Sequence, residues 1–169
     1  TDVQSDALLE EARKAAQLRC QGIVAVYDVG RHDGISFIIS DLIDGSNLAD
    51  LIARQHPDMV TSVKLVAEVA EHLHYAHEQG FIHRDIKPAN ILIDKVGKPF
   101  ITDFGIAVSH EELLRSRNAA TGTLPYMSPE QVAGEIQLIG ARTDVYALGV
   151  VLYELLTGKL PYPARTPTA

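Results

Sequence analysis

Four polar residues in the middle of the chain have the types and the spacing that phosphoryl transfer requires. Asp85, Lys87 and Asn90 share one short segment, and Asp103 follows eighteen residues after Asp85. Asp85 can accept the proton of an attacking hydroxyl, and Lys87 can neutralise a transferring phosphate. Asn90 and Asp103 offer the oxygen ligands that Mg²⁺ prefers. Because this reaction depends on positioning and charge neutralisation more than on covalent chemistry, these four residues fit it.

The segments around these residues resemble the protein kinase family. Residues 83–90 read His-Arg-Asp-Ile-Lys-Pro-Ala-Asn, similar to the catalytic loop of that family. Residues 103–105 read Asp-Phe-Gly, similar to the metal-binding start of its activation segment. Residues 121–130 read Thr-Gly-Thr-Leu-Pro-Tyr-Met-Ser-Pro-Glu and resemble its substrate-docking loop, with Ser128 where the family often has alanine. The first string alone would match by chance roughly once in 10⁷–10⁸ positions at average residue usage.

The resemblance implies a role for each of the four polar residues. Asp85 is the expected catalytic base, and Lys87 is expected to contact the γ-phosphate of ATP. Asn90 and Asp103 are the expected ligands of two Mg²⁺ ions. Thr123 is expected to hydrogen-bond Asp85 and Lys87, and together with Lys87 it marks the branch that is specific for serine and threonine.

Further residues are expected at the ATP site or behind the catalytic loop. Residues 37–45 resemble the last strand of the small lobe and the hinge, with Ser40 as a small gatekeeper. The backbone of Asp41 and of Ile43 is then expected to hydrogen-bond adenine. Glu11 resembles the helix glutamate that orients the ATP-anchoring lysine. Asp144 resembles the helix aspartate that braces the backbone of the catalytic loop.

The polar segment after Asp-Phe-Gly suggests control by phosphorylation. Residues 106–120 are irregular, as in a mobile activation loop. A phosphate added there can pair with Arg84 and order the loop. The acceptors are Ser109, Ser116, Thr121 and Thr123, of which we favour Thr121.

Hydrophobic periodicity and turn residues predict the elements that must position these side chains. Helices are expected over residues 6–18, after residue 47, from residue 128, and over 61–79 and 142–157. Antiparallel hairpins are expected from 23–29 with 36–39 and from 91–94 with 100–102. On the helix over 61–79, one apolar stripe is expected, made of Val63, Val66, Ala67, Ala70, Leu73 and His77. On the last helix, Leu148, Leu152 and Leu155 form one face, which we expect further helices to cover.

The order of strands and helices predicts an α+β class. The resemblance implies a protein-kinase-like fold, with residues 1–40 as the remainder of the small lobe, 41–45 as the hinge and 46–169 as part of the large lobe. The chain contains neither the glycine-rich loop nor the strand lysine that pairs with Glu11. We therefore expect an internal piece of a kinase domain, truncated at both ends, which alone binds ATP weakly and is inactive or nearly so.

Composition excludes several other classes of protein. The chain has 169 residues with 15 Lys plus Arg against 22 Asp plus Glu, so its formal net charge is −7. Such a surface repels nucleic acid backbones. Cys20, the single cysteine, cannot form an internal disulfide, which fits a reducing, cytoplasmic setting. No run of about 18 apolar residues predicts a membrane span, although a longer parent chain with an anchor is compatible with the resemblance. His72, His74 and His77 are not expected to bind a metal, because residues two apart on a helix point in different directions.

The expected function is transfer of the ATP γ-phosphate to serine or threonine hydroxyls of a protein substrate, with ATP and Mg²⁺ as cofactors. The string Ile-Val-Ala-Val-Tyr-Asp-Val-Gly and the string Ser-Pro-Glu-Gln resemble the bacterial branch of eukaryotic-like kinases, which implies a role in bacterial signalling. Two alternatives remain open: a pseudokinase that acts as a scaffold, and a kinase of similar fold for small molecules.

Overall fold

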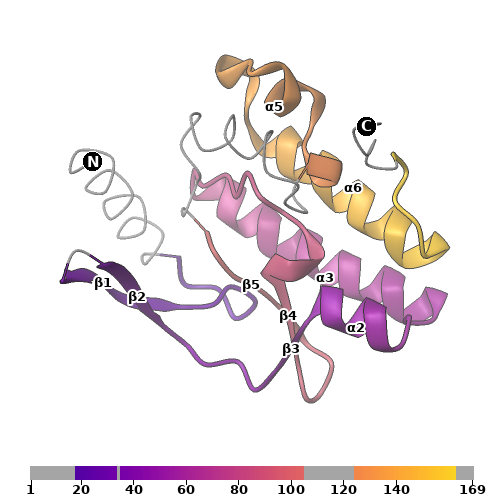
Figure 1. Ribbon diagram of the computed structural model, residues 1–169, viewed down its shortest axis with the longest axis horizontal. Helices are drawn as coiled ribbons and strands as arrows, with labels where there is room; N and C mark the ends of the chain where they lie inside the picture. The colour runs from indigo at the N-terminus through magenta and orange to yellow at the C-terminus, as the bar shows by residue number, and fades with distance from the viewer. Residues whose placement is uncertain (1–17, 34, 105–123, 163–169) are drawn as a thin grey trace, which may run out of the picture.

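The chain forms a small two-stranded sheet that is attached to a larger, mainly helical body (Figure 1). The computed structural model describes residues 18–33, 35–104 and 124–162, and the helix expected over residues 6–18 falls almost wholly outside them. The elements of the described part run in this order: β1 (Val26–His32), β2 (Ile35–Ser40), β3 (Gly45–Asn47), α2 (Leu48–Arg54), α3 (Met59–Glu78), η1 (Pro88–Asn90), β4 (Ile91–Asp94), β5 (Pro99–Ile101), η2 (Leu124–Tyr126), α5 (Pro129–Ala133), η3 (Ile136–Leu138) and α6 (Ala141–Thr157).

Both predicted hairpins are present, and the mixture of helices with antiparallel sheets agrees with the α+β class. Strand β1 pairs antiparallel with β2, and β4 pairs antiparallel with β5. Strand β1 begins three residues later than the β-branched run suggested, because residues 23–25 leave the hairpin. Ile23 instead forms a parallel bridge with Ile101 of β5, which ties the small sheet to the body.

Strand β3 is an element that the sequence did not predict. It follows residues 41–44 and pairs antiparallel with β4, so the larger sheet has the order β3-β4-β5. A glycine is required at its start, because a Cβ atom on Gly45 would lie 1.9 Å from the carbonyl oxygen of Ile93. Three residues with one glycine carry too little pattern to be recognised as a strand.

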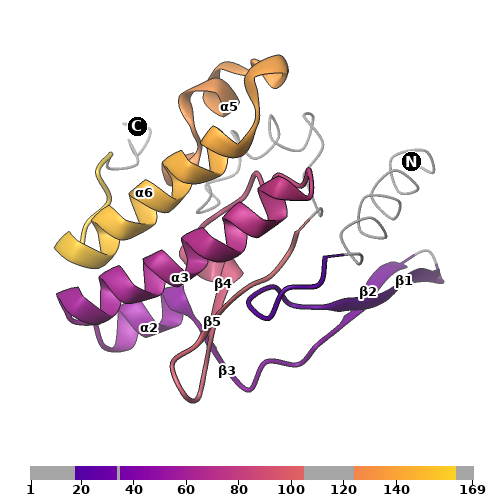
Figure 2. The same cartoon turned by 180° about the vertical axis from the view of Figure 1, so that it is seen from behind.

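Helices α3 and α6 lie side by side and build the core of the body (Figure 2). Helix α3 begins after the N-cap Asp58, whose carboxylate accepts the Val60 and Thr61 N–H groups at 2.9 and 3.1 Å. The predicted stripe on α3 is partly wrong, since Val63, Ala67 and Ala70 are exposed. The buried face is instead made of Ser62, Leu65, Val66, Val69, Leu73 and Ala76.

The expectation for α6 also needs correction. Leu148 and Leu155 are 7% and 1% exposed and Leu152 is half-buried, because α3 packs against this face. These leucines therefore need no further helices to cover them. The apolar side chains that α6 leaves exposed are Val145, Tyr153 and Leu156.

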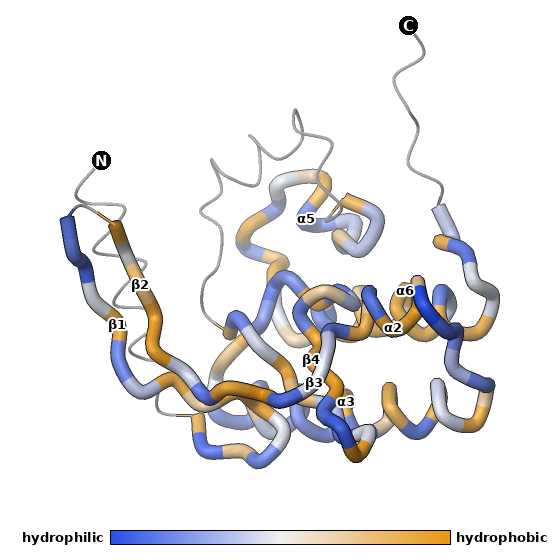
Figure 3. The backbone as a smooth tube through the Cα atoms, turned by 60° about the horizontal axis from the view of Figure 1, so that its bottom comes forward, coloured by the Kyte–Doolittle hydropathy of each residue, from blue (hydrophilic) through white to orange (hydrophobic). Residues whose placement is uncertain are grey.

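The small sheet contributes little to this core. Figure 3 shows β2 as a largely hydrophobic strand beside the more polar β1. Ile35, Phe37, Ile38 and Ile39 of β2 are all at least 37% exposed, and from β1 only Val29 is fully buried. No helix in the described part of the chain is long and apolar enough to cross a membrane.

Candidate active site

The catalytic loop, residues 83–90, is held from behind by α6. Asp144 near the start of that helix is fully buried, and its two carboxylate oxygens accept the N–H of His83 at 2.8 Å and the N–H of Arg84 at 2.7 Å. The ring of His77 on α3 contacts the same carboxylate through Nε2 at 2.8 Å. Asp144 therefore braces the loop backbone as expected, and His77 is engaged in the core rather than in a histidine cluster.

His83 connects the catalytic loop to the segment that contains Asp103. Its buried ring places Nε2 2.8 Å from the carbonyl oxygen of Thr102, and Nδ1 accepts the N–H of Asp85 at 3.2 Å. A carbonyl can only accept, so the proton of the neutral ring lies on Nε2. The ring also packs edge-on against Phe104, with ring centroids 4.6 Å apart. Two distant segments are thus fixed to each other by one side chain.

The side chains of Asp85, Lys87 and Asn90 meet within the loop. Lys87 Nζ lies 2.8 Å from Asp85 Oδ2, and both side chains are only about one-fifth exposed, at 20% and 23%. The Asn90 Nδ2 group donates to the same oxygen at 3.0 Å and to the Asp85 backbone carbonyl at 2.9 Å. The second carboxylate oxygen, Asp85 Oδ1, is buried and has no hydrogen-bond partner among the described residues. Burial of such an oxygen costs folding free energy unless another molecule donates a hydrogen bond to it.

The residues expected to bind Mg²⁺ fit a hard cation. Asn90 uses both N–H bonds of its amide on Asp85, which leaves its oxygen Oδ1 as the atom for a ligand role. Asp103 has an exposed carboxylate at the end of the sheet and a left-handed backbone with φ 63°. Non-glycine residues in that conformation are uncommon and cluster at functional sites.

The residues expected to form the hinge lie in the strand and the connector that precede β3. Ser40 ends β2 opposite Val26, and Asp41 and Ile43 follow it. The Asp41 N–H donates to the Ala25 carbonyl at 2.9 Å, so its own carbonyl is the group left to receive a donor from a purine. The Asp41 carboxylate accepts the hydroxyl of Tyr27, and this bond is the main cause that raises the Tyr27 pKa.

Several predicted residues lie outside the described part of the chain. Glu11 falls in residues 1–17, and Thr123 falls in residues 105–123 together with Ser109, Ser116 and Thr121. The structure therefore brings together Asp85, Lys87 and Asn90, and it leaves the roles of Glu11 and Thr123 as predictions.

Gln131 on α5 is a site residue that the sequence analysis missed. Its side chain is 9% exposed, and its Nε2 group donates to the carbonyl of Arg84 in the catalytic loop at 2.7 Å. Its Oε1 atom accepts the N–H of Ser128 at 3.0 Å, as part of a capping box at the start of α5. The capping signal was visible in the sequence, but a bond that spans 47 residues was not.

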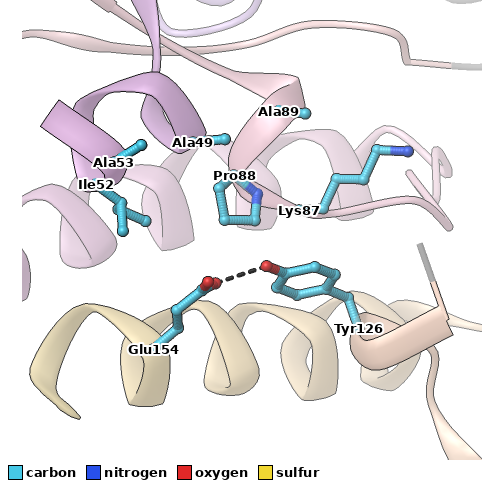
Figure 4. A pocket seen from close by; sticks show the side chains of 8 residues that line it. All are labelled: Ala49, Ile52, Ala53, Lys87, Pro88, Ala89, Tyr126 and Glu154. Atoms are coloured by element: carbon cyan, nitrogen blue, oxygen red, sulfur yellow. Dashed lines mark hydrogen bonds between the residues drawn. The ribbon is translucent and has the colours of Figure 1, made fainter. Parts of the chain in front are cut away.

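A cavity of about 390 Å³ opens beside the catalytic loop. Lys87, Pro88 and Ala89 form one wall, and small or apolar residues of α2 form another (Figure 4). Across the cavity, the Tyr126 hydroxyl donates to Glu154 of α6 at 2.6 Å. Burial and this bond raise the Tyr126 pKa far above its ordinary range, so the phenol stays protonated. Sequence spacing gave no sign of this cavity, because its walls come from four separate elements.

Comparison with known proteins agrees with this geometry. A profile of the protein kinase domain matches residues 1–169, the whole chain. The chain belongs to the protein kinase family. Its fold agrees with that of the kinase domain of PknI from Mycobacterium tuberculosis, with a TM-score of 0.77 at 29% identity, over 99% of this chain and 63% of that one.

Bacterial serine/threonine protein kinases are among the relatives in sequence. PknB of Mycolicibacterium smegmatis is 40% identical over 94% of this chain, and PrkC of Bacillus subtilis is 38% identical over 92%. The chain spans about a quarter of the length of these relatives, 26% and 24%. The fold and the family of these protein kinases are those that the catalytic-loop motif predicted.

Proposed function

We propose that this chain carries the catalytic centre of a serine/threonine protein kinase. The observation that carries the proposal is the carboxylate of Asp85. One of its oxygens is held by Lys87 and Asn90, and the other is buried and unpartnered within the described ranges. A hydroxyl group of a substrate can supply the missing hydrogen bond, and this is the position from which a base removes the proton.

In the proposed reaction, a serine or threonine hydroxyl donates to Asp85 Oδ1 and attacks the γ-phosphorus of ATP. The new O–P bond forms as the bond to the β-phosphate oxygen breaks, and Asp85 takes the hydroxyl proton. Lys87 holds the ground-state orientation of Asp85 and supplies positive charge beside the transferring phosphate. Thr123 is proposed to hydrogen-bond the same pair.

The nucleotide is proposed to enter between the small sheet and the body. Asp41 and Ile43 offer backbone groups to adenine, Ser40 lies behind it, and Glu11 orients an anchoring lysine. Asn90 Oδ1 and the Asp103 carboxylate are the proposed ligands of Mg²⁺, which when bound neutralises the charge of the phosphates. In this division, residues 1–40 belong to the small lobe, 41–45 to the hinge and 46–169 to the large lobe.

A protein substrate is favoured over a small molecule. The cavity beside Lys87 is continuous with the catalytic loop and is lined by the docking-loop residue Tyr126, so a side chain next to the phosphorylated hydroxyl can enter it. The volume of the cavity is within the usual range for ligand sites, so the cavity can hold a substrate side chain. Dependence on ATP and a single free cysteine support a cytoplasmic setting.

The test is transfer of radiolabelled phosphate from Mg·ATP to a general basic protein, with the complete gene product that contains these residues. Asp85→Asn should lose transfer by about 10²–10⁴-fold, because the amide cannot accept the proton. The matched control is Asp33→Asn, which changes an exposed carboxylate 86% accessible in the β1–β2 turn. Absence of transfer from a folded, ATP-binding protein would instead support a scaffold.

A further inference from the structure

The side chain of Gln131 links α5 to the catalytic loop with both ends of its amide. Nε2 donates to the Arg84 carbonyl at 2.7 Å, and Oε1 accepts the Ser128 N–H at 3.0 Å. A backbone carbonyl can only accept and a backbone N–H can only donate, so the orientation of this amide has one solution. Gln131 is 9% exposed, and its bond to Arg84 is partly buried.

The carbonyl that Gln131 holds belongs to the peptide unit directly before the proposed base. The Arg84 carbonyl and the Asp85 N–H lie in one rigid plane. Gln131 binds the oxygen of this plane, and His83 Nδ1 accepts its N–H at 3.2 Å. Both polar groups of this peptide plane are therefore held by hydrogen bonds.

The backbone at this point needs such support. Arg84 has φ 68°, in the left-handed region that a non-glycine residue keeps only when its surroundings impose it. Its N–H is already fixed by Asp144 at 2.7 Å. The bond from Gln131 fixes the carbonyl on the other side of the same residue.

The opposite orientation of the plane is disfavoured at both ends. A half-turn would point the Arg84 carbonyl at His83 Nδ1, an acceptor, because the proton of that ring is on Nε2. It would also point the Asp85 N–H at the Nε2 group of Gln131, a donor. Gln131 and His83 together therefore select one orientation of the peptide from which Asp85 extends.

We propose that Gln131 is a positioning residue for phosphoryl transfer, which fixes the Arg84–Asp85 peptide plane and so the direction of the Asp85 carboxylate. The inference rests on the proposed function, since it assigns Asp85 as the base. It also makes α5, the helix that begins with the Ser-Pro-Glu segment, a direct support of the catalytic loop.

The deciding variant is Gln131→Glu in the complete gene product. It keeps an acceptor for the Ser128 N–H but places an oxygen against the Arg84 carbonyl. We expect kcat to fall by about 10–100-fold, while the KM for ATP changes by less than about twofold, because Asp85 is displaced and the nucleotide contacts are not. Gln131→Met, which keeps the burial and removes both bonds, should show the same split.

Amide hydrogen exchange gives a readout that does not need activity. We expect the Asp85 N–H to exchange at least about tenfold faster in Gln131→Glu, with the amides of α3 unchanged. The control is Gln137→Glu, the same chemical change at an exposed position of η3, which should alter neither quantity.

Each outcome separates this inference from the proposed function. A variant that lowers the melting temperature but keeps both kcat and the Asp85 exchange rate of the original protein would overturn the positioning role. If the original protein transfers no phosphate, the proposed function fails, and the exchange of the Asp85 N–H still decides whether Gln131 holds the peptide plane.

Discussion

At the scale of single residues, Asp85 shows how a site can be prepared before its substrate arrives. Lys87 and Asn90 both act on one oxygen of its carboxylate, while the buried second oxygen has no partner in the described segments. An unsatisfied buried acceptor costs about 1–3 kcal/mol of folding free energy. Under the proposed function, a substrate hydroxyl that donates to this oxygen would recover that energy on binding.

Substitution of Asn90 tests how the carboxylate of Asp85 is held. Asn90→Asp removes two hydrogen bonds to Asp85 and places a second negative charge beside it. The like charge repels the Asp85 carboxylate, which then leaves the position that the two hydrogen bonds hold. We expect kcat to fall by about 100-fold. An unchanged kcat would show that the two hydrogen bonds from Asn90 do not position Asp85 for the reaction.

His72 predicts how stability depends on pH. Its ring lies where a side chain on Gly22 would have to be, with a Cβ–ring distance of 1.3 Å, and burial followed by the nearby Lys98 charge lowers its pKa. The unfolded chain therefore takes up this proton at a higher pH than the folded chain does. Stability should fall as pH drops through about 6.5, the ordinary value for histidine.

Urea unfolding at a series of pH values checks this expectation. His72→Gln should remove part of the loss of stability between about pH 7 and 5. His74→Gln is the control, because that ring is 74% exposed and lies beside Glu78 on the same helix. Equal pH dependence in all three proteins would contradict the assignment to His72.

At the scale of elements, helix α6 supports the backbone of the catalytic loop. Its residue Asp144 accepts hydrogen bonds from two backbone N–H groups of the loop and contacts the His77 ring of α3. The expected helix over 142–157 was nearly right in its bounds. Its role was recognisable only from the family resemblance, because an aspartate in a first turn is otherwise explained by the helix dipole.

Asp144→Asn should lower the free energy of unfolding by about 1–3 kcal/mol, since an amide NH₂ would face a backbone N–H. Combined with His77→Gln in a double-mutant cycle, it should show a coupling of about 0.5–3 kcal/mol. Chemical unfolding of the four proteins measures this coupling. Simple additivity would mean that the contact between His77 and Asp144 contributes nothing.

Helix α2 depends on its N-cap. The Asn47 side chain accepts the Asp50 N–H at 2.8 Å, and the helix places Ala49, Ile52 and Ala53 in the cavity wall. Asn47→Ala should cost about 1 kcal/mol of stability. The rate of transfer to a protein substrate should change more than the KM for ATP does. Steady-state kinetics with each substrate varied in turn can separate these two effects.

The sequence predicted most elements where local signals agree. Gly158 ends α6 in a left-handed conformation with φ 69°, and Asn47 caps α2. Both helix boundaries could therefore be recognised from the residue type at that position. The errors have a different origin. The stripe of α3 was displaced because alanines and valines occur around the whole helix, and contact with α6 and β5 selects the buried face.

The site shows the same division. Asp85, Lys87 and Asn90 are close in sequence, so their meeting was predictable from one motif. Gln131 and the Tyr126–Glu154 pair join segments that are far apart in the chain, and no local pattern reports such contacts. Long-range pairing of this kind became visible only once the helices had been placed.

At the scale of the whole molecule, the small sheet exposes apolar residues that the body does not cover. Ile35 is 72% and Ile39 49% exposed, and an isolated two-stranded sheet is at best marginally stable. A chain of residues 1–169 alone should therefore bind hydrophobic dyes and self-associate. Light scattering should show less association for the Ile35→Lys, Ile39→Lys double variant than for Val145→Lys on α6. Equal association of the two variants would place the adhesive surface elsewhere.

Two attachments between the small sheet and the body flank the hairpin, one before β1 and one after β2. One is the bridge between Ile23 and Ile101, where Val24 also donates to the Ile101 carbonyl at 2.9 Å. The other is the segment after β2, where the Asp44 carbonyl accepts the Lys95 N–H at 3.2 Å before Gly45 begins β3. Both attachments end on the three-stranded sheet, so any movement of the small sheet relative to the body would have to bend the chain at these two segments.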